Sequence, residues 1–174
     1  MCRCAVRYDD TMKDWLALYK YRGHERLVEI VAASAAFALE RLEDALVGGQ
    51  AAEDARSVIQ AITSVPLSKE RLRERGFNQA ECIAARLSEW YGIPYRPMLR
   101  RLKHTEKQSL KSRRSRVTDM NGIFALADTD PTGTLPSNLL LLDDVYTTGS
   151  TMNECARILR EGGARFVCGI VWAR

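Results

Sequence analysis

The sequence predicts an α/β fold with a mainly parallel central sheet flanked by helices, and three observations carry this prediction. Segments with helical and strand-like patterns alternate along the chain, which is typical of parallel α/β sheets. The last of these segments are a strand over 139–143, a helix over 151–161 and a strand over 165–172, which form a strand–helix–strand unit. The length of 174 residues and the 46% of hydrophobic residues suit one packed domain over 1–174.

The first half of the chain is expected to begin with a short strand and two helices. Gly23 should end the first helix, and Gly48-Gly49 should end the second, which is alanine-rich. A β-branched run that stops at Pro66 predicts a buried strand. The expected ranges are 3–9 for the first strand, 11–21 and 26–46 for the helices, and 57–65 for the second strand.

The middle of the chain mixes one clear helix with polar, basic segments. Asn78 is expected to cap a helix that runs to about residue 91, with Ile83, Leu87 and Trp90 on one side. A polar, basic loop is expected over 67–77, strands over 95–102 and 123–126, and a second loop over 128–138. The polar, basic residues 103–122 are not assigned to a helix or strand.

The stretch 139–151 reads Leu-Leu-Leu-Leu-Asp-Asp-Val-Tyr-Thr-Thr-Gly-Ser-Thr, and it predicts an anion site. A strand leads through a loop into a helix N-terminus, whose unpaired N–H groups and dipole attract anions. Gly149 lets the backbone approach a phosphate, and Asp143 and Asp144 suit the vicinal hydroxyls of a sugar or a Mg²⁺ ion. Further hydroxyl donors are expected from Thr147, Thr148, Ser150 and Thr151. The stretch therefore predicts a pocket for a phosphorylated sugar.

Other interpretations of this stretch are weaker. An acidic turn before a capped helix would need only one Ser or Thr, whereas four hydroxyl residues and a glycine follow the two acids. No Gly-Lys-Ser/Thr follows the glycine, so the stretch is not a Walker loop, and it does not match a dinucleotide fingerprint.

A second group of candidate binding residues lies in 65–79, after the strand expected to end at Pro66, and this group is basic. Arg71, Arg73 and Arg75 alternate, so an extended segment would direct all three guanidinium groups to one side. Guanidinium groups bind phosphate oxygens in a bidentate manner. The alternative is an ordinary solvated basic loop.

Charge is unevenly distributed along the chain. The net charge is +4, yet the segment 69–116 alone holds fourteen Lys or Arg and five Glu. A basic block in an otherwise acidic chain predicts an anionic partner, which could be pyrophosphate, a nucleotide or nucleic acid.

The five cysteines do not predict a disulfide framework or a zinc site. Cys82, Cys155 and Cys168 lie in apolar patterns and are expected to be buried thiols. Cys2 and Cys4 are half of a potential metal site without a second pair, so zinc is not expected. No apolar run is long enough to insert into a membrane and no signal peptide is visible, so the expected location is cytoplasmic.

The stretch 139–151 closely resembles the 5-phosphoribosyl-1-pyrophosphate (PRPP) loop of type I phosphoribosyltransferases. The resemblance implies that Asp143 and Asp144 are catalytic acids that hold the ribose hydroxyls and Mg²⁺, directly or through water. It also implies a phosphoribosyltransferase-like fold and a homodimer. The 5-phosphate is then expected on Thr147, Thr148, Gly149, Ser150 and Thr151.

Three motifs together resemble the ComF family of competence-associated, phosphoribosyltransferase-like proteins. They are Lys20-Tyr21-Arg22-Gly23, the run from Pro66-Leu67 to Arg71-Leu72-Arg73-Glu74-Arg75-Gly76-Phe77-Asn78-Gln79, and the PRPP loop. Spaced residues between them, from Thr105 to Asn121, agree as well. The N-terminal zinc module of many ComF proteins is not matched, so functions that depend on it are not carried over.

The family resemblance implies that the loop after Pro66 binds pyrophosphate and that the basic segment 100–116 covers bound PRPP. The cations expected to clamp the pyrophosphate are Arg71, Arg73, Arg75, Lys111 and Arg113. His104 is a candidate acid or base in that segment, although a lone loop histidine is usually only solvated.

Two functions fit these expectations. One is an enzyme that transfers ribose 5-phosphate from PRPP to an acceptor that the sequence does not identify. The other is a non-catalytic accessory protein of DNA uptake that binds PRPP or a nucleotide, with single-stranded DNA and a competence protein as further candidate partners.

Overall fold

The computed structural model describes residues 1–7, 9–21, 26–47, 58–102, 122–128 and 134–174. Its elements, in chain order, are β1 (Cys2–Val6), α1 (Asp10–Tyr21), α2 (Arg26–Val47), β2 (Ala61–Ser64), α4 (Lys69–Arg75), α5 (Gln79–Tyr91), β3 (Leu99–Arg101), β4 (Phe124–Leu126), β5 (Asn138–Val145), α7 (Ser150–Glu161) and β6 (Phe166–Ala173). Among the described residues, no helix has both the length and the apolar character needed to cross a membrane.

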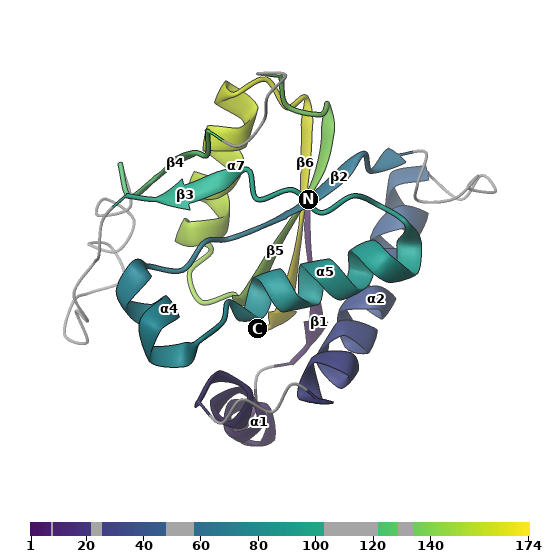
Figure 1. The fold of residues 1–174 in the computed structure, drawn as a ribbon. Helices are drawn as coiled ribbons and strands as arrows, with labels where there is room; N and C mark the ends of the chain where they lie inside the picture. Colours follow the sequence, from purple (N-terminus) through teal and green to yellow (C-terminus); the bar gives the residue numbers. More distant parts are fainter. Residues whose placement is uncertain (8, 22–25, 48–57, 103–121, 129–133) are drawn as a thin grey trace.

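The central sheet is parallel, with the strand order β1-β6-β5-β2 (Figure 1). Leucines 139–142 of β5 lie between β2 and β6, and all are almost fully buried, as expected for an interior strand of a parallel sheet. Leu142 pairs with Ser64 of β2 and with Ile170 of β6. The predicted fold class, an α/β fold with a mainly parallel sheet, is confirmed.

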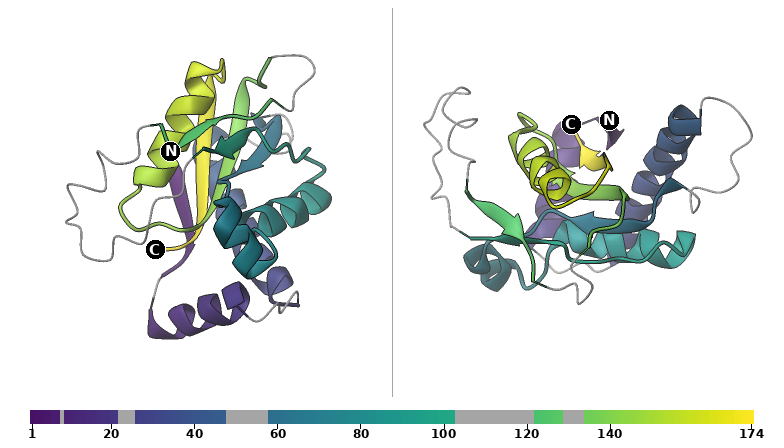
Figure 2. Two further views of the ribbon diagram at one scale, coloured as in Figure 1. Left: turned by 60° about the vertical axis from the view of Figure 1, so that its left-hand side comes forward. Right: turned by 90° about the horizontal axis from the view of Figure 1, so that it is seen from above.

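Helices cover the sheet on both faces (Figure 2). Leu140 and Leu142 point into a core shared with α2 and α5, whereas Leu139 and Leu141 point into a second core shared with α7 and with β3 and β4. This alternation follows from the two-residue period of a strand. Helix α1 lies beyond the carboxyl ends of β5 and β6, close to the C-terminus (Figures 1 and 2).

The segments expected as strands over 95–102 and 123–126 form a small sheet of their own. Strands β3 and β4 pair antiparallel, with Arg101 opposite Phe124. In the sequence, most of the basic segment 100–116 falls between β3 and β4. Residues 103–121, which include Lys111, Arg113 and His104, lie outside the described residues.

Two expectations about individual elements were wrong. Residues 69–75 were expected in a loop, but they form helix α4. Trp90 was expected on the same apolar side of α5 as Ile83 and Leu87, but it is 43% exposed whereas those two are buried. The apolar stripe of α5 continues instead from Leu87 to Tyr91, one helical turn further on, and Tyr91 packs against the core.

Candidate functional site

The two acids of the anion motif lie at the carboxyl end of β5. Because side chains alternate along a strand, Asp143 follows the face of Leu141 and Asp144 follows the face of Leu142. The backbone N–H of Asp144 donates to Asp143 Oδ1 at 2.9 Å, which fixes one carboxylate oxygen against the chain. Both residues are half-buried, so their carboxylates remain accessible at the sheet edge.

The loop that follows β5 turns sharply at Gly149. This residue has a φ of 77° and is the N-cap of α7, with no side-chain hydrogen bond at the cap. A Cβ at this position would collide with the hydroxyl of Tyr146, whose ring lies 5.2 Å from the Arg174 guanidinium carbon. The turn therefore requires glycine both for its backbone angle and for space.

Within the part of the chain that the structure describes, two hydroxyl groups of the loop bond to each other. Thr148 Oγ1 and Ser150 Oγ share a hydrogen bond of 2.7 Å, and Thr148 Oγ1 accepts a longer bond from the Ser150 N–H. The first turn of α7 thus starts without a side-chain cap, which leaves it suited to an anion.

Helix α4 is short and is held by its ends. Ser68 Oγ accepts from the Arg71 N–H at 3.3 Å, and the left-handed Gly76 donates its N–H to the Leu72 carbonyl at 2.8 Å. No residue of the helix is buried. Arg71 and Arg75 are four residues apart and share a face, whereas Arg73 lies on a different one.

A cavity of about 200 Å³ joins the two motifs. Its lining is Val65, Pro66, Leu67, Arg71, Arg75, Asn78, Ala80, Arg101, Asp143, Asp144, Val145, Thr147 and Thr151. Acids from β5 thus face guanidinium groups from α4, with threonines from the loop beside them.

The predicted site residues do not all line this cavity. Thr148, Gly149 and Ser150 shape the loop beside it. Arg73 points elsewhere because 69–75 is helical and not extended. Lys111 and Arg113 lie outside the described residues.

Asn78 has a larger role at the site than the expected helix cap. Its Oδ1 accepts from the Ala80 N–H at 3.2 Å, and its Nδ2 donates to the Val65 carbonyl at 3.1 Å. Asn78 therefore ties the start of α5 to the end of β2, the two elements that border the cavity. The capping signal was visible in the sequence, but the bond to Val65 depends on the tertiary structure.

Arg101 was expected in the covering segment, and it lies instead in β3 at the cavity wall. Burial lowers the pKa of Arg101, and the nearby Arg71 guanidinium lowers it further. Asp143 is among the acidic groups that oppose this shift. Its guanidinium carbon lies 5.3 Å from the centroid of the Phe124 ring. Two cations and a carboxylate therefore converge in this part of the cavity.

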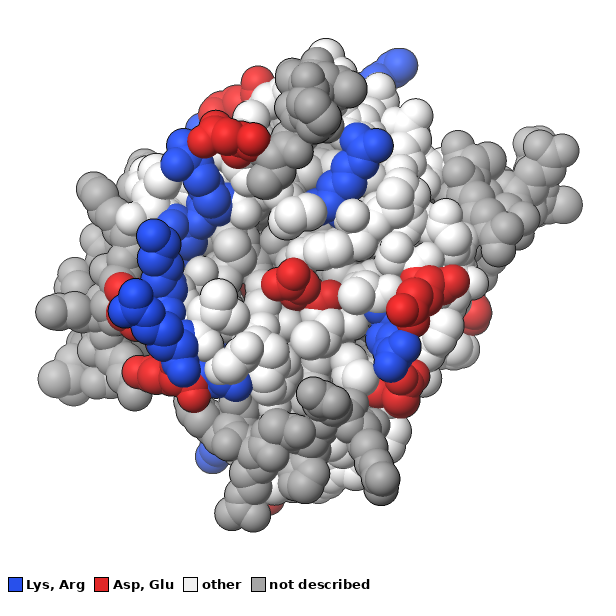
Figure 3. Space-filling model, viewed as in Figure 1, with Lys and Arg blue, Asp and Glu red and all other residues white. Residues whose placement is uncertain are grey.

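Figure 3 shows a band of basic side chains over β3 and α4. We call it the basic band and define it as Lys69, Arg71, Arg73, Arg75, Arg100 and Arg101. Arg100 is held 3.7 Å from Asp128 in an exposed ion pair. The band continues outward from the cavity, so the cavity opens beside a positively charged surface.

A divalent ion in the cavity would need ligands beyond the two carboxylates. Mg²⁺ is commonly bound by one or two carboxylates plus phosphate oxygens and water. Asp143 and Asp144 supply such carboxylates. Among the residues that the structure describes, no group of three or more His, Cys, Asp or Glu could hold a metal by itself.

The chain is similar to competence proteins of several bacteria. It is 31% identical to competence protein ComFC of Bacillus subtilis over 161 residues, which cover 92% of this chain and 58% of the relative. The ComFC protein of Streptococcus pneumoniae is 29% identical and matches over 95% of this chain and 64% of its own length. Competence protein F of Haemophilus influenzae is 39% identical over 60% of this chain and 45% of its own length.

The family models and the solved structures say less about this chain than these relatives do. The chain spans about three fifths of the length of the ComFC relatives. No family model matches the sequence. Among solved structures, an allosteric regulatory enzyme of purine biosynthesis aligns over 76% of this chain and 25% of its own, with 20% identity and a TM-score of 0.42. A likeness this distant supports no conclusion about function.

Proposed function

The chain belongs to the ComF family of competence proteins, and from this premise we propose that its anion cavity binds PRPP together with Mg²⁺. The observation that carries the proposal is the convergence of Asp143, Asp144, Thr147, Thr151, Arg71 and Arg75 around one cavity. Carboxylates, hydroxyl donors and guanidinium groups are the groups that a ribose with a phosphate and a pyrophosphate needs.

Each part of the cavity has a distinct role in this proposal. The loop 147–151 and the N-terminus of α7 bind the 5-phosphate through N–H and hydroxyl donors. Asp143 and Asp144 hold the ribose hydroxyls, and with the phosphate oxygens they complete the ligands of Mg²⁺. Arg71, Arg75 and Arg101 hold the pyrophosphate.

The same arrangement supports transfer of ribose 5-phosphate to a nitrogen acceptor. When the bond between C1 of the ribose and the pyrophosphate breaks, negative charge grows on the leaving group. Guanidinium groups already positioned there stabilise that charge more in the transition state than in the ground state. Bound Mg²⁺ supplies further neutralisation of the pyrophosphate.

The first experiment is a calorimetric titration of PRPP into the purified protein, with Mg²⁺ and then with excess EDTA. We expect saturable binding that weakens when Mg²⁺ is removed. In the Asp143→Ala/Asp144→Ala protein we expect affinity to fall at least about 100-fold, because charge-assisted contacts contribute roughly 1.5–3 kcal/mol each.

A matched control is Asp10→Ala/Asp14→Ala, which removes two exposed acids of α1 that do not line the cavity. This protein should bind PRPP as the parent does. Unchanged affinity in the Asp143/Asp144 variant would disprove the site, and a folded parent protein that binds no PRPP would disprove the proposal. Release of pyrophosphate with candidate nitrogen acceptors then tests transfer.

A second candidate function is binding of single-stranded DNA by an accessory protein of DNA uptake. The observation in its favour is the basic band, which extends beyond the cavity (Figure 3). Phosphate binding in the cavity already accounts for Arg71 and Arg75, whereas it leaves Lys69 and Arg73 without a role.

A further inference from the structure

A second cavity, of about 550 Å³, lies between α1, α2 and α5. Its lining is Tyr19, Val28, Gly76, Phe77, Cys82, Ala85, Arg86 and Glu89, and it shares no residue with the anion cavity. The segment 76–80 separates the two, since Gly76 and Phe77 line one cavity and Asn78 and Ala80 line the other. Its volume falls within the range of roughly 300–1,000 Å³ that small-molecule sites occupy.

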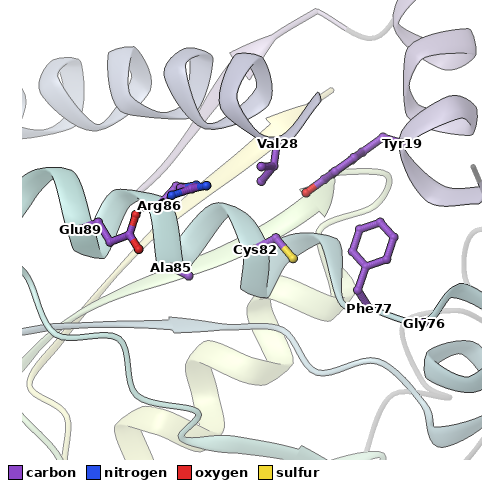
Figure 4. A pocket seen from close by; sticks show the side chains of 8 residues that line it. All are labelled: Tyr19, Val28, Gly76, Phe77, Cys82, Ala85, Arg86 and Glu89. Atoms are coloured by element: carbon purple, nitrogen blue, oxygen red, sulfur yellow. Dashed lines mark hydrogen bonds and ion pairs between the residues drawn. The ribbon is translucent and has the colours of Figure 1, made fainter. Parts of the chain in front are cut away.

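The two ends of this cavity differ in chemistry (Figure 4). At one end, the rings of Tyr19 and Phe77 meet edge to face, with centroids 5.6 Å apart and an interplanar angle of 61°. The Tyr19 hydroxyl donates to the Gln79 carbonyl at 3.3 Å, so this buried ring is held in place. Tyr19 is only 1% exposed and supports Phe77 from behind, so the half-buried Phe77 ring is the aromatic surface that a planar ligand can contact.

The other end is lined by Arg86 and Glu89, and a second acid, Glu29, contacts Arg86 from outside the lining. Arg86 contacts Glu89 at 2.7 Å and Glu29 of α2 at 2.8 Å, so one guanidinium is shared between two acids. This ion-pair group has a net charge of −1. It disfavours a phosphate or carboxylate and favours an uncharged or cationic polar group, in contrast to the anion cavity.

We propose that the cavity between α1, α2 and α5 is a second small-molecule site, which takes an aromatic compound whose polar end is uncharged or cationic. The ring lies against Phe77, which Tyr19 supports, and between Val28 and Cys82. The polar end lies toward Glu89 and Arg86. The site does not depend on PRPP binding, because its residues and its charge are separate.

The test compares three probes that have the same ring and differ in charge: benzylamine, benzyl alcohol and benzoate. Binding to the intact chain is measured by ligand-observed NMR titration. We expect benzylamine and benzyl alcohol to bind and benzoate to bind at least tenfold more weakly. Equal or stronger binding of benzoate would overturn the proposed chemistry.

Two further readouts locate the binding. Ala85→Leu extends an exposed side chain of α5 into the cavity and should weaken benzylamine at least tenfold, whereas Ala33→Leu on the exposed surface of α2 should leave it unchanged. Benzylamine should also slow alkylation of Cys82, which lines the cavity, but not of the exposed Cys2. Binding with no protection of Cys82 would overturn the proposed location, even if the Ala85 variant fails to fold.

Discussion

Arg71 and Arg73 lie two positions apart in the sequence, but only one of them is in the lining of the anion cavity. Arg71 lines it, and Arg73 does not. Because both are arginines on one short helix, they separate a specific contact from the general effect of positive charge.

We therefore predict that Arg71→Ala weakens PRPP binding roughly 10- to 100-fold, the equivalent of one charge-assisted contact of about 1.5–3 kcal/mol. Arg73→Ala should change it less than about threefold, since an exposed charge outside the cavity is screened. Calorimetry at fixed salt measures both. Equal losses in the two variants would mean that only the overall charge of α4 matters.

Gly149 is the residue on which the shape of the loop 147–151 depends. A methyl group there meets the Tyr146 ring and also strains a backbone with a φ of 77°. Gly163 also has a positive φ, at 108°, but a Cβ there has nothing within 4 Å.

We predict that Gly149→Ala lowers PRPP affinity at least tenfold, because the loop must move away from Tyr146 to admit the methyl group. Gly163→Ala should retain the affinity for PRPP. Its thermal stability should nevertheless fall, as that of Gly149→Ala does, because alanine strains a backbone with a positive φ. Titration and thermal unfolding of both proteins provide the measurement. Normal PRPP binding by Gly149→Ala would show that this turn does not form the phosphate site.

At the level of elements, α4 is the one on which the cation side of the site depends. It spans seven residues and buries none of them, so its caps at Ser68 and Gly76 supply the stabilisation that packing gives to the other helices. Losing an N-cap costs about 0.5–2 kcal/mol.

We expect Ser68→Ala to fray α4 and to weaken PRPP binding several-fold, because Arg71 and Arg75 then lose their common face. Ser68→Thr retains the capping oxygen and should stay close to the parent. Hydrogen exchange of the α4 amides, measured together with affinity, tests the cause. Unchanged amide protection in Ser68→Ala would contradict it.

At the scale of the whole molecule, one face carries a continuous band of basic side chains, with some acids beside it (Figure 3). The basic band lies over β3 and α4 (Figure 3), whereas the second cavity is lined by Glu89 and by Arg86, which Glu29 also contacts. A polyanion approaching this face would meet the band.

If single-stranded DNA binds to the basic band, log affinity for oligothymidine should fall linearly with log salt concentration, by about 0.7 for each phosphate contacted. Replacing Lys69 and Arg73 with alanine should reduce the slope by about 1.4 and leave PRPP binding intact. Replacing Arg160 and Arg165 instead is the control, because these exposed arginines lie at the other end of α7. A slope that does not change in the Lys69/Arg73 variant would place DNA elsewhere.

Much of this arrangement could be predicted from local sequence, because local chemistry decides it. The apolar run before Asp143 predicts a buried strand, and the hydroxyl-rich turn with Gly149 predicts the loop that follows. Helix α4 was missed although its signals are local: Ser68 and Gly76 are suitable caps, and Lys, Glu, Arg and Leu favour helix. The alternation of the arginines was given more weight than these caps, so a loop was predicted where α4 lies.

The sequence by itself determined the order of the strands, the helices other than α4, and the loop 147–151 with the two acids before it, because each depends on neighbours a few residues away. Only the tertiary structure decided that β2 pairs with β5, and this pairing brings 65–80 beside 143–151. Strand neighbours in a parallel sheet are chosen by packing across both faces, which no single segment encodes. The positions of Arg101 and Asn78 at one cavity, and the second cavity between α1, α2 and α5, follow from that packing.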